Sequence, residues 1–294
     1  MQQPLIDIIV PTYNRKSDIE TFINEISKQT YTNFKVYIVD DFGDYPLKDI
    51  IPKDDKFEYI RLDKNRGQAA ARNYALEKSQ GDIIVSMDDD AWFYENNNAL
   101  QLIVEYFNSN SNMGCLMFDI KTPDRPWLSE MNSLNDNQQI GTHITCGCAY
   151  KSEVLKKING FPGFFHSGAE ESDITFKILN RGYNIIFGKQ IKVFHNYNED
   201  YRTEQWYRQL RHNTTRNDLL LVIMYYPLLY ITPYFFGKWL SHIAFTLKKK
   251  RDLPISLYYT FISLFTSFRL MPTVIKKRNP MSHKLFKHWL KIRF

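Results

Sequence analysis

Three consecutive carboxylates, Asp88, Asp89 and Asp90, follow an apolar run that ends at Met87. Neighbouring carboxylates repel one another unless positive charge lies among them. A magnesium or manganese ion prefers oxygen ligands, would supply that charge and could also bridge the oxygens of a diphosphate. The alternative is a solvated acidic turn, because aspartate is common in turns. The triplet alone leaves both interpretations open.

Two further polar segments stand in the same position relative to apolar runs. The segment Pro11–Asn14 follows the run Leu5–Val10, and Asp40 and Asp41 follow the run Phe34–Val39. In open α/β sheets, ligands collect at the carboxyl ends of the strands. We therefore expect all three polar segments to meet at one rim of a sheet.

Short apolar strands alternate with amphipathic helices along this part of the chain. We expect strands at residues 5–10, 34–39, 57–62 and 82–87, with a helix at 68–78 between the last two. A first helix is expected after Asn14, because Ser17 and Glu20 have the spacing of a capping box and apolar residues then recur at helical period. This alternation predicts an α/β fold with a mostly parallel, twisted sheet and flanking helices.

Several short motifs follow one another in a fixed order between residues 5 and 200. They are IVPTYNR at 9–15, VDD at 39–41, NRG at 65–67, ARN at 71–73, GDII at 81–84 and DDD at 88–90, then GFP at 160–162, EESD at 170–173, GY at 182–183 and His195. This series resembles the family-2 glycosyltransferases, inverting enzymes with the Rossmann-like GT-A fold that use nucleotide-diphosphate sugars. The shared order and spacing make the likeness far more specific than any single motif.

The resemblance implies a binding site for the sugar donor. Pro11, Thr12, Tyr13 and Asn14 would form the loop that passes under the donor nucleotide. Asp41 would contact the base, and its alternative role is to close a strand in an aspartate-rich turn.

The resemblance also implies a divalent metal cofactor, manganese or magnesium. Asp88 and Asp90 match the family's Asp-x-Asp motif, in which Asp90 is the favoured metal ligand and Asp88 a second one. Asp88 or Asp89 would also lie near the ribose. Arg72 would approach the phosphates or the sugar of the donor, and its alternative role is a charge on a helix surface.

Glu171 is the candidate general base, which would accept the proton of the attacking hydroxyl while the metal stabilises the departing diphosphate. The family usually has Glu-Asp where this chain has Glu170 and Glu171, so either glutamate could be the base. The structural alternative is that both carboxylates favour the positive N-terminus of the helix that runs toward Leu179.

His195 closes the apolar run Gln190–Phe194, and its match to a late histidine of the family implies a metal ligand or a contact to the diphosphate. A lone histidine is otherwise more often structural. Cys115, Cys146 and Cys148 form neither a paired disulfide set nor the four-ligand spacing of a zinc site, which predicts a reducing, cytosolic compartment. The last two are expected to be small packed residues rather than nucleophiles, since no basic partner is evident.

The charge is unevenly distributed along the chain. Residues 205–294 carry 16 Lys or Arg and two acids, which leaves 22 basic and 30 acidic residues for the first 204. We expect a catalytic domain at 1–204 and a helical, basic and apolar extension at 205–294. The uncharged stretches 219–236 and 253–268, the basic clusters 248–251 and 276–278, and the amphipathic end at 284–291 favour in-plane attachment to an anionic membrane. The alternative is that these hydrophobic residues pack on the catalytic domain or on a second copy of the chain.

Taken together, the sequence predicts a metal-dependent, inverting glycosyltransferase that acts on a glycan or lipid-linked hydroxyl acceptor at the inner face of the cell membrane. Cell-surface polysaccharide or glycolipid assembly is the expected setting. A catalytically silent, sugar-nucleotide-binding subunit is the alternative, because the Glu-Asp pair is altered. A nucleotidyltransferase is disfavoured because PTYN is not a Gly-rich basic loop, and nucleic acid is not expected because the basic tail is interrupted by apolar stretches.

Overall fold

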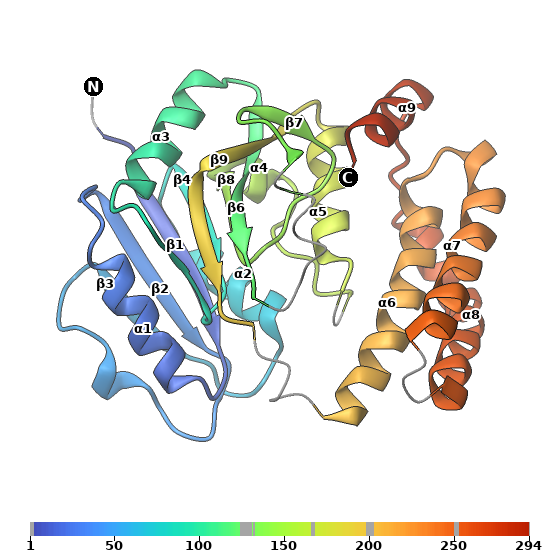
Figure 1. Cartoon of the computed structure of the whole chain (residues 1–294), viewed down its shortest axis with the longest axis horizontal. Coiled ribbons are helices and arrows are strands. Elements are labelled where there is room, and N and C mark those ends of the chain that lie inside the picture. Colours follow the sequence, from blue (N-terminus) through green and yellow to red (C-terminus); the bar gives the residue numbers. More distant parts are fainter. Residues whose placement is uncertain are drawn as a thin grey trace. The chain divides into compact units, whose positions relative to one another are not determined.

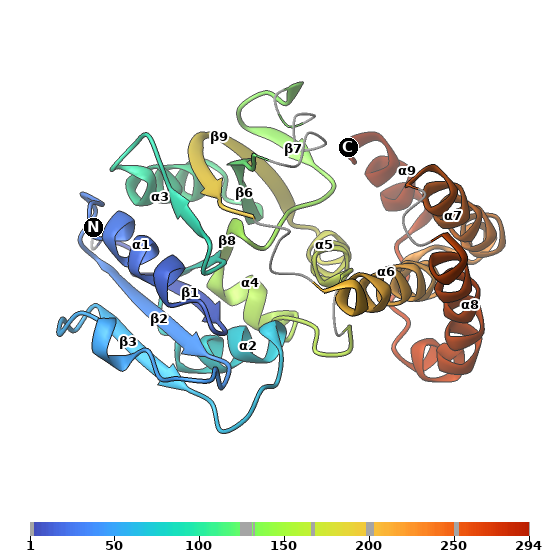
Figure 2. The same ribbon diagram turned by 60° about the horizontal axis from the view of Figure 1, so that its bottom comes forward.

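The computed structural model describes residues 3–123, 131, 133–165, 168–197, 203–249 and 253–293. The chain forms two compact units, and Figures 1 and 2 show their elements. Among the described residues, the first unit lies within 3–163 and 181–197, and the second lies within 164–180 and 203–293. Each unit has its own core.

The first unit is built on one sheet, whose strands follow the order β3-β2-β1-β4-β8-β6-β9-β5, with β7 paired to β9. The strands are β1 (Ile6–Thr12), β2 (Phe34–Asp40), β3 (Phe57–Arg61), β4 (Ile83–Met87), β5 (Ala91–Phe93), β6 (Met113–Lys121), β7 (Gln138–Ile140), β8 (Gly147–Lys151) and β9 (Asn184–His195). The predicted parallel pairing holds for β3-β2-β1-β4, whereas the other half of the sheet is mixed. The expected α/β fold with a central sheet and flanking helices is confirmed.

The change of direction falls between β4 and β8, which pair antiparallel with Met87 opposite Gly147. The end of β4 therefore lies beside the start of β8. Asp88, which follows β4, and Cys146, which precedes β8, consequently lie at the same rim of the sheet.

Strand β1 is longer than predicted, because it continues through Pro11 to Thr12. Proline has no N–H to donate, but its presence at this point does not prevent pairing. Pro11 and Thr12 stay in register with Val39 and Asp40 of β2, and the carbonyl of Thr12 accepts a hydrogen bond from the N–H of Asp41 at 2.9 Å. All seven residues of β1 are buried, as expected for the centre of a sheet covered on both faces.

Helices cover both faces of this sheet (Figure 2): α1 and α3 lie on one face and α2 on the other. The helices of the first unit are α1 (Lys16–Ile26), α2 (Gln68–Lys78), α3 (Ala99–Ser109) and α4 (Ser152–Lys157), with a short 3-10 helix at Lys48–Ile50. Helix α2 has the predicted bounds. The capping box predicted for α1 is wrong, because Ser17 lies inside the helix and Arg15 occupies the N-cap position without a side-chain cap.

The second unit is helical and contains α5 (Glu170–Asn180), α6 (Glu204–Tyr225), α7 (Leu228–Lys249), α8 (Leu253–Lys276) and α9 (His283–Ile292). Its core includes every residue from Leu219 to Tyr226, so this half of the first uncharged stretch packs inside the protein. Pro227 separates α6 from α7, since a helix commonly ends before a proline.

The amphipathic helix α9 packs within the second unit, and the prediction that its apolar face lies against a membrane is wrong. Phe286 and Trp289 are buried, and both rings contact Tyr226 of the same unit. Arg278 of the predicted basic cluster donates to the carbonyls of Ile223 and Tyr226 at the end of α6. Its guanidinium therefore satisfies carbonyls that a helix end leaves without partners.

Helices α7 and α8 lie side by side (Figure 1) and expose apolar side chains on their outer surface. The exposed residues at helical spacing are Leu229, Phe236, Leu240 and Leu247 on α7 and Tyr258, Phe261, Phe265, Phe268 and Ile275 on α8. The two stripes adjoin, because Phe261 contacts Trp239 of α7 and Phe268 contacts Phe235. We call this set the α7–α8 apolar face. Among the described residues, no helix has the length and apolar character needed to cross a bilayer.

Candidate functional site

The three aspartates lie where β4 leaves the sheet, and each carboxylate has a different set of partners. Asp88 accepts hydrogen bonds from Arg72 and from the side-chain amide of Gln68, both on α2. Asp89 accepts from the hydroxyl of Thr12 at 2.9 Å, which ties the end of β4 to the end of β1. We call these residues, 88–90, the acidic corner.

Asp90 is buried, and both of its carboxylate oxygens are engaged. Oδ2 lies 2.8 Å from Nη1 of Arg15, and Oδ1 lies 3.1 Å from Nε2 of His195. Burial alone would raise the pKa of Asp90, but the hydrogen bond and charge of His195 and the charge of Arg15 outweigh it and lower that pKa. Burial and the neighbouring charge of Asp90 instead raise the pKa of Asp89 to about 8. The charged form is therefore stabilised on Asp90 and disfavoured on Asp89 until further positive charge enters the corner.

His195 ends β9 and joins the acidic corner through its ring. Nε2 faces Asp90, and Nδ1 lies 3.7 Å from the sulfur of Cys146. The expectation that Cys146 has no basic partner is therefore wrong. Residues 49 positions apart meet because Cys146 precedes β8 and His195 ends β9, and both strands belong to the mixed half of the sheet.

The donor atoms at this corner suit a divalent cation. Asp88, Cys146 and His195 each bring one ligand atom within 4.8 Å of the others, and Asp90 contacts the same imidazole. Carboxylate oxygens with an imidazole nitrogen match the preferences of manganese and, through the oxygens, of magnesium. The predicted ligands Asp88, Asp90 and His195 thus lie close together, and their role as ligands remains a prediction.

The loop after β1 is fixed by side-chain hydrogen bonds. Asn14 has a left-handed backbone with φ of 57°, and its amide group both accepts from the N–H of Asp44 and donates to the Asp44 carboxylate. A Cβ added to Gly43 would lie 2.8 Å from the side-chain oxygen of Asn14, so this close approach requires glycine. Tyr13 is exposed at the rim. The segment predicted to pass under a nucleotide is therefore held in one conformation, while its contact with a nucleotide remains a prediction.

Asp41 links the end of β2 to the segment that precedes α2. Its two carboxylate oxygens accept the backbone N–H groups of Arg66 and Gly67, each at 2.8 Å. Each carboxylate oxygen has a second lone pair, so these bonds leave acceptor capacity on both. The structure thus shows a structural role for Asp41, and its contact with a base remains a prediction.

Arg72 is buried, so its alternative role as a charge on a helix surface is wrong. Its guanidinium is almost fully enclosed, with Nε donating to the hydroxyl of Ser86 at 3.0 Å and Nη2 donating to Asp88. The ring of Phe161 lies 5.6 Å from the guanidinium carbon. Arg72 therefore fixes the position of Asp88, the first aspartate of the acidic corner, from the buried side.

Glu170 and Glu171 lie in the second unit, in the first turn of α5 together with Asp173. Three acidic residues in a first turn are favourable beside the positive end of the helix dipole. The two glutamates therefore stand at a helix N-terminus, as their structural alternative requires. The catalytic role of either residue remains a prediction.

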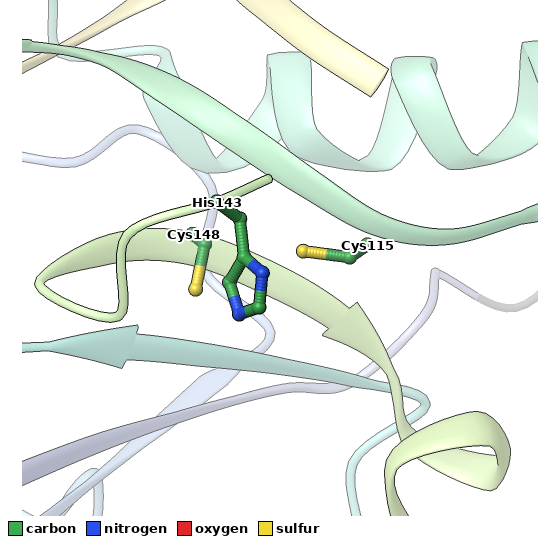
Figure 3. A group of neighbouring side chains, drawn as sticks. All are labelled: Cys115, His143 and Cys148. Atoms are coloured by element: carbon green, nitrogen blue, oxygen red, sulfur yellow. The ribbon is translucent and has the colours of Figure 1, made fainter. Parts of the chain in front are cut away.

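A second group of potential metal ligands, Cys115, His143 and Cys148, lies inside the first unit (Figure 3). All three side chains are buried, and Nε2 of His143 is 2.7 Å from the hydroxyl of Tyr150. Burial raises the pKa of the Cys115 thiol and lowers the pKa of His143 to about 3. A neutral Cys115 thiol and a neutral His143 imidazole are therefore favoured here. Cys148 is fully buried beside them, which agrees with the prediction that it is a packed core residue.

Three residues of this site received no individual role from the sequence. Arg15 belongs to the IVPTYNR motif, Gln68 begins α2 and Ser86 lies in β4, where hydroxyls are unremarkable. Each acts by contacting a residue at least 14 positions away. A basic residue directly after the first polar loop was the one available signal, because an acidic corner requires a counter-charge.

Comparisons with known proteins identify the family of the chain. The family model described as glycosyl transferase family 2 matches residues 7–159, which is just over half of the chain. The chain belongs to glycosyl transferase family 2. The match contains α2, the acidic corner and all of β1 but its first residue, whereas Glu170, Glu171 and His195 lie beyond it.

Curated relatives share segments of the chain. An uncharacterized glycosyltransferase of Haemophilus influenzae is 33% identical over 192 residues, which is 60% of this chain and 62% of that protein. TuaG of Bacillus subtilis, named as a teichuronic acid biosynthesis glycosyltransferase, is 34% identical over 95 residues, which is 31% of this chain and 38% of that protein. The chain thus spans less than two thirds of the length of either relative.

Solved structures show the same fold at low sequence identity. The mannosyltransferase PcManGT from Pyrobaculum calidifontis, in complex with GDP-Man and Mn²⁺, has a TM-score of 0.63 at 19% identity, covering 99% of this chain and 84% of that one. Residues 1–349 of S. aureus TarS, in complex with UDP-GlcNAc, have a TM-score of 0.55 at 17% identity, covering 92% and 90%. These likenesses support the predicted GT-A fold.

Proposed function

We propose that this chain is an inverting glycosyltransferase that moves a sugar from a nucleoside-diphosphate donor to a hydroxyl acceptor with the help of a divalent metal. The observation that carries the proposal is the meeting of Asp88, Asp90 and His195 at the rim where β4 ends, in a chain of glycosyl transferase family 2. That rim is where open α/β sheets bind ligands.

Different residues of the first unit would bind the metal and the donor. Asp90 and His195, with Asp88 beside them, would hold the metal, which supplies positive charge to the diphosphate as it leaves. Thr12 and Asn14 fix the loop on which Tyr13 is presented, and Asp41 faces the same rim from β2. Arg72 orients Asp88 from within the core.

The acceptor hydroxyl must lose a proton as it attacks the anomeric carbon. We propose that Glu171 accepts this proton, with Glu170 as the other candidate. Both carboxylates lie in the first turn of α5, at the position of the family's Glu-Asp motif. A single in-line displacement by the hydroxyl inverts the anomeric centre. A catalytically silent sugar-nucleotide-binding subunit is the competing function, and the absence of the family's usual aspartate after Glu170 favours it.

The substrates of similar proteins indicate a setting. PcManGT binds GDP-Man, TarS binds UDP-GlcNAc, and the name of TuaG refers to teichuronic acid biosynthesis. We therefore place the chain in the assembly of a cell-surface polysaccharide or glycolipid, with a glycan or lipid-linked acceptor. Such acceptors favour a position on the inner face of the cell membrane.

The α7–α8 apolar face is the surface we propose for membrane attachment. Large exposed apolar patches mark interaction surfaces. Helices α7 and α8 contain no acidic residue, and Lys248, Arg269 and Lys276 are exposed on them. Basic side chains around an apolar face suit the anionic surface of a membrane, whereas a second copy of the chain would bring further positive charge. A homo-oligomer formed through this face is the competing arrangement.

The enzyme proposal is tested with a panel of nucleotide sugars and manganese. Thermal shifts of the purified chain should identify the donor by selective stabilisation in the presence of manganese. With that donor, transfer to acceptor or hydrolysis should be measurable, and Asp90→Ala should abolish it. Donor binding without turnover for any acceptor would favour the silent subunit, and neither binding nor turnover would overturn both functions.

A further inference from the structure

Arg15 places a positive charge inside the acidic corner. Its Nη1 lies 2.8 Å from Oδ2 of Asp90, and its Nε lies 3.8 Å from Oδ1 of Asp89. The same Nη1 is 3.4 Å from the carboxylate of Asp18, in the first turn of α1. One guanidinium therefore reaches three carboxylates, two of them buried and the third half-buried at the surface.

The contacts of Arg15 overlap with those that a divalent cation needs. Asp90 already uses one oxygen for Arg15 and the other for His195. A cation bound through Asp90 would sit next to the guanidinium, and two positive charges at such short range repel each other strongly in a buried setting. The guanidinium and the cation thus compete for the same negative charge.

Asp18 offers Arg15 a second partner. It lies three positions along the chain, where side chains of one helix face meet. The long arginine side chain can transfer between partners by changing its rotamers, so the backbone need not move. The exchange therefore moves the guanidinium charge from Asp89 and Asp90 to Asp18.

We infer that Arg15 is an internal competitor for the metal, which occupies the acidic corner before loading and turns to Asp18 when the cation binds. This inference rests on the proposed function, since it concerns the same metal site. It makes metal binding weak in the absence of nucleotide. A nucleoside diphosphate strengthens that binding, because its phosphates add negative charge at the rim and give the guanidinium another partner.

Calorimetric titration of manganese chloride into the nucleotide-free chain tests the competition. Arg15→Met removes the charge and keeps most of the side-chain length, and Lys16→Met removes a neighbouring exposed charge as the matched control. Arg15→Met should tighten manganese binding by about fivefold or more relative to Lys16→Met, the factor for an ion-pair contribution of about 1 kcal/mol. Equal or weaker binding in Arg15→Met would overturn the inference.

A second titration removes the charge of Asp18 and leaves Arg15 in place. Asp18→Asn should weaken manganese binding more than Glu20→Gln, an exposed acid on the same helix, by about two- to fivefold. In an Arg15→Met background this excess should disappear, because the partner of Asp18 is gone. An excess that persists there would show only general electrostatics and would refute the exchange. If Arg15→Met does not fold, Arg15→Gln, which also removes the charge, takes its place in both titrations.

The same titrations separate this inference from the proposed function. With uridine or guanosine diphosphate present, manganese should bind the native chain more tightly, and Asp90→Asn should remove that binding. If manganese binds through Asp90 and Arg15→Met has no effect, the competitor role alone fails. If no variant binds manganese with or without nucleotide, the metal assignment of the proposed function fails and the inference fails with it.

Discussion

The hydroxyl of Tyr225 donates a hydrogen bond to Oδ1 of Asp173 at 2.6 Å. Both residues are buried, and the carboxylate also pairs with Lys177 at 2.6 Å. The end of α6 is thereby joined to the first turn of α5. Because Glu170 and Glu171 belong to that turn, a packed helix and not a free loop carries the candidate base.

The two glutamates should separate in a matched pair of variants. Replacing the general base by the isosteric amide should lower kcat by about a hundredfold to ten-thousandfold, because the acceptor hydroxyl loses its proton acceptor. We expect this of Glu171→Gln, with a much smaller effect of Glu170→Gln. Initial rates at saturating donor give the answer, with Glu153→Gln on the surface of α4 as the control. Full activity in both variants would exclude both residues as the base.

Arg72 and Arg66 provide a comparison between a buried and an exposed ion pair. Arg72→Met should cost about 3 kcal/mol of unfolding free energy, because it leaves Asp88 and Ser86 without their buried donor. Arg66→Met breaks an exposed pair with Asp63 and should cost less than about 1 kcal/mol. Urea unfolding monitored by circular dichroism measures both. Similar losses in the two variants would contradict the structural role assigned to Arg72.

Membrane attachment through the α7–α8 apolar face can be measured by sedimentation with lipid vesicles. The chain should bind vesicles that contain phosphatidylglycerol and bind pure phosphatidylcholine less. Phe265→Ser and Leu229→Ser should each weaken binding by about tenfold, which corresponds to about 1.5 kcal/mol of lost burial. Tyr45→Ser, an exposed apolar position in the first unit, is the control. A stable dimer in solution that Phe265→Ser dissociates, without vesicle binding, would replace the membrane by a second copy.

His143 should make stability depend on pH. Burial lowers its pKa in the folded chain to about 3, whereas an exposed histidine titrates near 6.5. The unfolded state therefore binds the proton first, so the contribution of His143 is complete above about pH 6.5 and is lost as pH falls toward 3, by up to about 1.4 kcal/mol per unit. Urea unfolding at pH 5 to 7 should show a flatter profile for His143→Gln than for the native chain. The exposed His288→Gln should not flatten it, and identical profiles for native and His143→Gln would refute the assignment.

The sequence predicted the parallel half of the sheet well, because each of its strands is a short, mainly apolar segment between polar ones. Strand β4 and helix α2 were found to within a residue, and the polar segments after β1, β2 and β4 do meet at one rim. Strand β1 continues past Pro11, where the sequence predicts its end, because a residue without an N–H can still stay in register with the neighbouring strand. The mixed half was not predicted, since the order of β8, β6 and β9 depends on contacts between distant segments.

The partners within the site were harder to predict than its members. The motif placed Asp88, Asp90 and His195 together, but nothing local shows that Arg15 turns back to Asp90, 75 positions away. The prediction for the apolar face of α9 is wrong for a related reason. An amphipathic pattern predicts that one face of a helix avoids water, but it does not predict what covers that face. Here Phe286 of α9 packs against Tyr226 of the same unit.

The antiparallel pairing of Met87 with Gly147 has a consequence for how such a site can diversify. Cys146 stands just outside the ladder, where its side chain reaches His195 without contributing to strand pairing. Gly147 next to it has no room for a larger residue, because a Cβ there would lie 2.8 Å from Ile120. If the acidic corner holds a cation as proposed, a harder donor in place of the Cys146 sulfur would change which ion fits there, while the pairing of the strands stays intact.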